Sequence, residues 1–150
     1  MTVAKLKSVS EPRGSSRTRG RSIHLIEAQA LFVPALVEVF AELGLDLLGV
    51  SGDVDLHGML ETQPDVVFVD ADYVNQEPLH LVSLLRTLVP EGAICVYTSE
   101  RDPRWAAACH AAGATAVLSK NARRGEVVAG LRDAVYHRTY TDVRLRDTGA

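Results

Sequence analysis

Short apolar runs alternate with amphipathic stretches along the chain from Ser22 to about residue 140. The runs are bounded by turn-forming residues, a pattern typical of strands. They predict strands over residues 23–27, 47–50, 66–69, 93–97 and 116–118. The stretches between them repeat apolar residues three or four positions apart, which is the spacing of one helix face. They predict helices over residues 31–43, 79–88, 103–112 and 124–137, and a short helix that ends at Leu60.

The alternation of five strands with five helices predicts an α/β fold. Right-handed helical crossovers join parallel strands and cover both faces of the sheet. We therefore expect a three-layer sandwich with a five-stranded parallel sheet in the middle. The run 66–69 is apolar at every position, as expected of a central strand that is buried on both faces. Asp102-Pro103 and Gly113 are residue types that begin and end helices, so they bound the fourth helix.

Composition and charge divide the chain unevenly. The 150 residues suffice for one domain with short tails. Residues 1–21 contain six cationic side chains and one acidic side chain, a net charge of +5. Since the whole chain carries −3, the remainder carries −8. We expect a disordered basic leader over residues 1–21. The acidic body argues against binding of nucleic acid by the domain itself.

Other compositional features concern the compartment. No apolar run approaches the roughly 20 residues that a membrane helix needs, and the N-terminus lacks the apolar region of a signal peptide. Cys95 and Cys109 lie in apolar stretches without metal-ligand spacing, which predicts buried reduced thiols. We expect a cytoplasmic protein with no membrane partner.

Polar residues with useful chemistry follow four of the predicted strands. Glu27 ends the first strand, Asp70 and Asp72 follow the third, Thr98 ends the fourth, and Lys120 follows the fifth. In open parallel sheets, sites form at the carboxyl ends of the strands, so these side chains should meet. A carboxylate cluster suits Mg²⁺, and a lysine beside a hydroxyl suits the oxygens of a phosphoryl group.

This arrangement resembles the receiver domains of bacterial two-component response regulators. The resemblance covers residues 22–140 and is carried by residues 25–32, 65–70, 96–99 and 113–120. Phe32 and the sequence after Lys120 bring the chain nearest to the NarL/FixJ subgroup. The resemblance implies a flavodoxin-like (βα)5 fold with strand order 2-1-3-4-5. It also implies that residues 141–150 form a tail or the start of a linker toward a DNA-binding domain.

The resemblance assigns roles to the strand-end residues. Asp70 is implied as the phosphoacceptor, and Thr98 and Lys120 as the switch and phosphate-contacting residues. Glu27 and Asp72 are implied to complete the acidic pocket, and with Asp70 they would form a weak Mg²⁺ site. The implied protein is a signalling module and not an enzyme. Its implied partners are a histidine kinase or another signalling protein, and a second copy in a homodimer.

Three departures from the receiver pattern change the expected function. Ala28 stands where the family has a second acid, Val117 stands at the aromatic switch position, and residues 72–76 replace the usual turn after the acceptor. Loss of a metal-ligating acid should cost at least ~10- to 100-fold in metal affinity. We therefore expect an atypical receiver that acts mainly through protein contacts, with weak or absent Mg²⁺-dependent phosphorylation at Asp70.

The sequence is also compatible with three alternative functions. One is a conventional phosphoacceptor that uses Asp72 to complete the Mg²⁺ site and is cut from a DNA-binding transcriptional regulator. Another is a flavodoxin-like cofactor binder, which would need a phosphate-cradling loop after the first strand, where the chain has residues 27–30 instead. A third is a haloacid-type hydrolase, because Asp70 and Asp72 are two residues apart, although the chain is short for that class.

Overall fold

The computed structural model describes residues 21–147 and contains a six-stranded, wholly parallel sheet. The strand order is β2-β1-β3-β4-β5-β6, so the predicted order 2-1-3-4-5 is confirmed and extended by one strand. The strands are β1 (Ser22–Ile26), β2 (Asp46–Ser51), β3 (Val66–Asp70), β4 (Ala93–Thr98), β5 (Ala116–Ser119) and β6 (Tyr140–Thr141). The helices are η1 (Ala30–Phe32), α2 (Val33–Glu42), α3 (Leu56–Thr62), α4 (Pro78–Leu88), α5 (Pro103–Ala112), α6 (Arg124–Val135) and η2 (Val143–Leu145).

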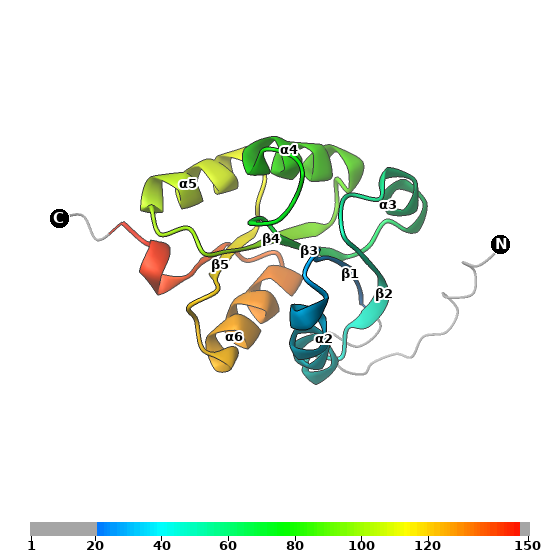
Figure 1. The fold of residues 1–150 in the computed structure, drawn as a ribbon, viewed down its shortest axis with the longest axis horizontal. Helices are drawn as coiled ribbons and strands as arrows, with labels where there is room; N and C mark the ends of the chain where they lie inside the picture. The colour runs from blue at the N-terminus through cyan, green and yellow to red at the C-terminus, as the bar shows by residue number, and fades with distance from the viewer. Residues whose placement is uncertain (1–20, 148–150) are drawn as a thin grey trace.

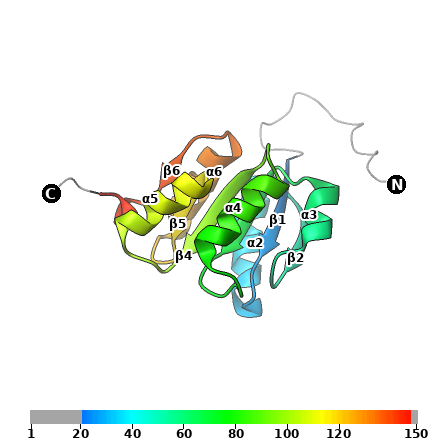
Figure 2. The ribbon, with the colours of Figure 1, turned by 90° about the horizontal axis from the view of Figure 1, so that it is seen from above.

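The helices cover the sheet in two layers, which confirms the predicted three-layer sandwich. Helices α3, α4 and α5 lie on one face, and α2 and α6 lie on the other (Figures 1 and 2). Each face has its own apolar core, one that includes Phe40 and Leu131 and one that includes Met59 and Leu85. All five residues of β3 are buried, because this strand lies in the middle of the sheet with helices on both sides.

The predicted helix boundaries follow from local chemistry. Asp102 caps α5, and its side chain accepts a hydrogen bond from the backbone N–H of Arg104, with Pro103 at the first helical position. The helix ends at Gly113, whose φ of +125° lies in the region that side chains rarely adopt. Asp55, rather than Asp53, caps the short helix α3 by accepting from the N–H of Gly58.

The C-terminal boundary extends beyond the predicted one. Instead of becoming a tail or linker at residue 141, the chain adds β6 beside β5, where the Tyr140 N–H donates to the Thr115 carbonyl. The Asp142 N–H donates to the Val117 carbonyl, and Leu145 is buried in the core that α4 and α5 share. Burial of an apolar side chain after the last helix therefore draws the segment up to residue 147 onto the domain.

The predicted basic leader lies almost wholly outside the described residues. Only Arg21, its last residue, is described, and Arg21 belongs to the folded body. Its guanidinium donates a hydrogen bond to the Val135 carbonyl and lies 4.9 Å from the centre of the Tyr136 ring. The cation is thus held at the end of α6, where the helix presents unpaired carbonyl groups.

Both cysteines are free and buried, as predicted. Burial raises the pKa of the Cys95 thiol to about 12, so it stays protonated at neutral pH. Burial, followed by the charges of Glu77 and Glu100, does the same for Cys109.

Between residues 21 and 147, each helix is too short or too polar to cross a bilayer.

Candidate functional site

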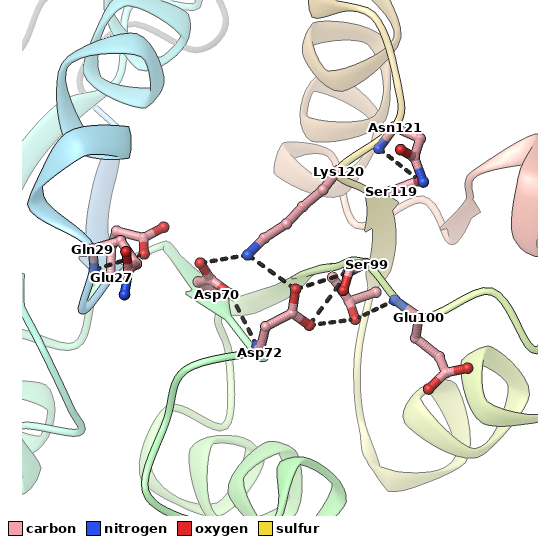
Figure 3. Close-up of polar contacts among 10 residues, drawn as sticks. Glu27, Gln29, Asp70, Asp72, Ser99, Glu100, Ser119, Lys120 and Asn121 are labelled. Carbon is pink, nitrogen blue, oxygen red and sulfur yellow. Dashed lines mark hydrogen bonds and ion pairs between the residues drawn. The ribbon is translucent and has the colours of Figure 1, made fainter.

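Five polar residues from four strands meet at the carboxyl edge of the sheet. Glu27 follows β1, Asp70 ends β3, Asp72 lies in the loop after β3, Thr98 ends β4, and Lys120 follows β5. Figure 3 shows Lys120 reaching from the end of β5 toward Asp70 and Asp72, with Glu27 on the side nearer β1. Parallel pairing brings these strand ends to the same edge, because β1, β3, β4 and β5 are neighbours in that order.

Lys120 links two of the carboxylates. Its Nζ lies 2.8 Å from Asp70 Oδ2 and 3.0 Å from Asp72 Oδ2. The Asp70 side chain is fully buried, and the Lys120 side chain is 17% exposed. Burial lowers the pKa of Lys120, but the hydrogen bonds to the two carboxylates outweigh burial and hold this pKa above its ordinary value. The ammonium group therefore carries its charge inside the pocket.

Asp72 is turned toward β4. Its Oδ1 accepts a hydrogen bond of 2.9 Å from Thr98 Oγ1, and its Oδ2 accepts one of 2.9 Å from the Ser99 N–H. Burial raises the pKa of Asp72, but hydrogen bonds from Lys120, Ser99 and Thr98 outweigh it and hold the pKa below its usual value. The Thr98 hydroxyl in turn accepts from the Glu100 N–H at 3.0 Å, which fixes its orientation.

Glu27 is the least satisfied of the carboxyl groups. Its Oε2 accepts a hydrogen bond from the Gln29 N–H, whereas no residue between 21 and 147 donates one to its buried Oε1. Burial and then the adjacent Asp70 carboxyl raise the pKa of Glu27 to about 7, against the opposing effects of the Gln29 amide and Lys120. Near neutral pH this side chain is therefore protonated in a large fraction of molecules.

Comparison with known proteins identifies the architecture. No protein-family model matches the chain, and no curated protein matches its sequence. Solved structures do match. A LuxR-family two-component response regulator from Aurantimonas sp. SI85-9A1 has a TM-score of 0.72 at 16% identity, covering 83% of this chain and 91% of that one. The receiver domain of the putative response regulator NarL from Mycobacterium tuberculosis has a TM-score of 0.70 at 18% identity, covering 79% and 98%.

A third match is the isolated REC domain of RcsB from Salmonella enterica serovar Typhimurium, solved with the phosphomimetic BeF3−. It has a TM-score of 0.72 at 10% identity, covering 83% of this chain and 95% of that one. The chain has the response-regulator receiver fold. At these identities the likeness establishes the receiver fold, and the chemistry of the pocket must be judged from its own residues.

The receiver fold raises the question of a metal site at this edge. Within residues 21–147, no group of three or more His, Cys, Asp or Glu side chains is arranged to hold a metal ion. The predicted ligand set of Glu27, Asp70 and Asp72 is therefore not assembled. The physical reason is that Asp72 is engaged by Thr98 and the Ser99 N–H, while the Lys120 ammonium lies against both aspartates. The residues present do not fit Mg²⁺, which requires near-octahedral oxygen ligands.

Aromatic rings surround Lys120 in this pocket, and sequence reasoning did not assign them to the site. The Lys120 Nζ lies 4.7 Å from the centre of the Tyr73 ring and 5.6 Å from those of Phe32 and Tyr97. Rings at these distances attract an ammonium group. The available signal was the position of Tyr97 beside Thr98 and of Tyr73 beside Asp72. Tyr73 is 48% exposed, so the mouth of the pocket is partly apolar.

A hollow of about 420 Å³ adjoins the pocket on the side of α5. Its lining includes the apolar residues Trp105, Pro78 and Ala71 and polar residues among which are Asp72 and Thr98. Trp105 also packs against the core under α4 and α5.

The raised pKa of Glu27 predicts a pH-dependent stability. The unfolded chain releases this proton near pH 4.5, but the folded domain retains it up to about pH 7. Because the folded state binds more protons between these values, stability falls as the pH rises through this window. Glu27→Gln removes the ionisation, so its unfolding free energy should exceed that of wild type by on the order of 2 kcal/mol at pH 8 and by little at pH 4.5.

Urea unfolding with EDTA present at both pH values measures this difference. A Glu27→Gln effect that is the same at pH 4.5 and pH 8 would contradict the raised pKa.

Proposed function

We propose that this chain is an atypical response-regulator receiver domain in phosphorelay signal transduction. It acts mainly as a protein-interaction module and catalyses no reaction on a substrate. Mg²⁺-dependent phosphorylation of Asp70 is weak or absent. The observation that carries the proposal is the engagement of Asp72 by Thr98, Ser99 and Lys120, which leaves the acidic pocket without a set of metal ligands.

The chemistry of aspartyl phosphorylation explains why the metal ligands matter. A carboxylate attacks a phosphoryl group, and cations must neutralise the charge that develops. In this pocket Lys120 is available as one cation. A second cation would need the acid that Ala28 replaces. Burial and the adjacent Asp70 carboxyl raise the pKa of Glu27, so a metal ion would have to compete with a proton for this carboxylate.

The alternative is a conventional phosphoacceptor in which Asp72 completes the Mg²⁺ site. It would require Asp72 to leave three donors, one of them the Lys120 ammonium at 3.0 Å. Charge-assisted hydrogen bonds are about twice as strong as neutral ones, so this rearrangement is unfavourable. The arrangement of Asp72 therefore supports the atypical receiver over the conventional one.

Interaction partners follow from the same proposal. A histidine kinase or another cytoplasmic signalling protein is the expected partner, and a homodimer is a second expectation. Among solved structures of this fold is one of two RcsB dimers bound to two parallel DNAs. The described body has no role in DNA binding in this proposal, because the chain beyond residue 21 carries a net charge of −8.

The test compares wild type with Ala28→Asp in acetyl phosphate and Mg²⁺. We expect little labelling of wild type, and at least ~10-fold more labelling of Ala28→Asp, because that variant restores a metal-ligating acid. Intact-mass spectrometry measures the added phosphoryl group, and Asp70→Asn is the matched control that removes the acceptor. Stoichiometric labelling of wild type at Asp70 would overturn the proposal in favour of the conventional phosphoacceptor.

A further inference from the structure

Three donors from two strands converge on one carboxylate at the site. Thr98 Oγ1 donates to Asp72 Oδ1 at 2.9 Å, and the Ser99 N–H donates to Oδ1 at 3.2 Å and to Oδ2 at 2.9 Å. Lys120 Nζ completes the set at 3.0 Å from Oδ2. A hydroxyl, a backbone N–H and an ammonium group are the donors that bind oxyanions such as phosphate. The geometry is that of an oxyanion site with a carboxylate already in it.

We propose that Asp72 is the resident anion of this site, so that the chain itself occupies the position that a phosphoryl group would take. The inference rests on the proposed function, because it explains how the pocket can be held in a liganded arrangement without phosphorylation. Removal of the Asp72 carboxylate would then leave an oxyanion site that accepts inorganic phosphate.

The loop after β3 holds the carboxylate in place. The Asp72 N–H donates to Asp70 Oδ1 at 2.9 Å, so the backbone of Asp72 is tied to the end of the strand. A tethered ligand competes at an effective concentration in the millimolar range or above, which a free anion must exceed. The low pKa of Asp72 agrees with a carboxylate that stays ionised in this position.

The Asp72 carboxylate also determines the position of the Thr98 hydroxyl. Thr98 Oγ1 donates to Asp72 and accepts from the Glu100 N–H, and only 1% of the residue is exposed. Because this hydroxyl already donates one hydrogen bond and accepts another, it would lose both if it reoriented. The receiver therefore stays in one arrangement of the β4 end, and any change of state must come from a partner that displaces Asp72.

The test measures binding of inorganic phosphate in EDTA by ¹H–¹⁵N NMR, with the Ser99 amide as the reporter. We expect Asp72→Ala to show a saturable shift of this amide, with at least ~10-fold tighter apparent binding than wild type. Asp53→Asn is the matched control, because it removes one acidic charge from a loop at the same edge, keeps an oxygen for the Asn75 side chain in the loop of Asp72, and leaves the three donors occupied. It should behave like wild type. Adding Thr98→Val to Asp72→Ala should abolish the shift.

The outcomes separate clearly. Equal responses of wild type and Asp72→Ala, or no response of Asp72→Ala, would overturn the inference. Circular dichroism checks that Asp72→Ala folds. If it does not fold, phosphate binding is measured on Asp72→Ser instead. Inorganic phosphate without Mg²⁺ does not phosphorylate Asp70, so this result is independent of the labelling test. Suppose that acetyl phosphate labels wild type, and that Asp72→Ala binds inorganic phosphate but wild type does not. These two results would reject the proposed function but would support Asp72 as the resident anion.

Discussion

Replacing Lys120 by methionine is expected to lower the free energy of unfolding by about 3 to 5 kcal/mol. Methionine can fill the space of the lysine stem, but it leaves the fully buried Asp70 carboxylate without its cation at 2.8 Å. An unpaired charge in the interior is costly because burial removes its solvation, and the hydrogen bond from the Asp72 N–H does not replace the lost cation. Asp72 loses a charge-assisted contact in the same variant. Urea denaturation at pH 7 measures the loss.

The double variant Lys120→Met with Asp70→Asn is the control for this explanation. It removes both charges, so it should recover a large part of the stability that the single variant loses. A single variant as stable as wild type would contradict a buried ion pair between these residues. A double variant no more stable than Lys120→Met would indicate that lost packing, rather than the unpaired carboxylate, causes the effect.

Leu145→Ala is expected to destabilise the domain by about 2 to 5 kcal/mol. Leu145 lies ten residues beyond the end of α6, yet it is only 1% exposed and packs in the core that α4 and α5 cover. Its truncation leaves a cavity between η2 and that core. Thermal and urea unfolding should both show the loss.

Val143→Ala is the matched control for Leu145→Ala, because it truncates an apolar side chain in the same short helix that is 56% exposed. Its effect should stay within about 0.5 kcal/mol. Equal effects of the two substitutions would mean that the C-terminal segment does not dock on the domain.

The positions of the first five strands could be predicted because burial leaves a strong pattern in the sequence, and their order followed from the resemblance to receiver domains. Residues 66–69 are apolar throughout, and the structure buries β3 on both faces. The ends of α5 could also be predicted, because Asp102 and Gly113 are residue types that cap helices. Strand β6 left no such pattern. It has two half-buried residues, Tyr140 and Thr141, and the buried Leu145 follows in η2.

The sequence could predict which residues lie at the candidate site, but not which of them contact one another. Parallel strand ends share one edge, so Asp70, Thr98 and Lys120 had to lie close together once the strands were placed. Whether Asp72 would face a metal or the donors of β4 depends on the direction of one side chain in a loop. Spacing along the chain carries no information about that direction, so the sequence could not show that Thr98 and the Ser99 N–H engage Asp72.

The short strand β6 has a consequence for association of the sheet with other chains. An exposed sheet edge offers unpaired N–H and C=O groups on which a foreign strand can add, and natural proteins protect such edges with very short strands. Here β6 occupies the edge of β5 with only two residues, followed at once by the turn of η2. This end of the sheet therefore presents almost no template for further growth into fibres or swapped oligomers.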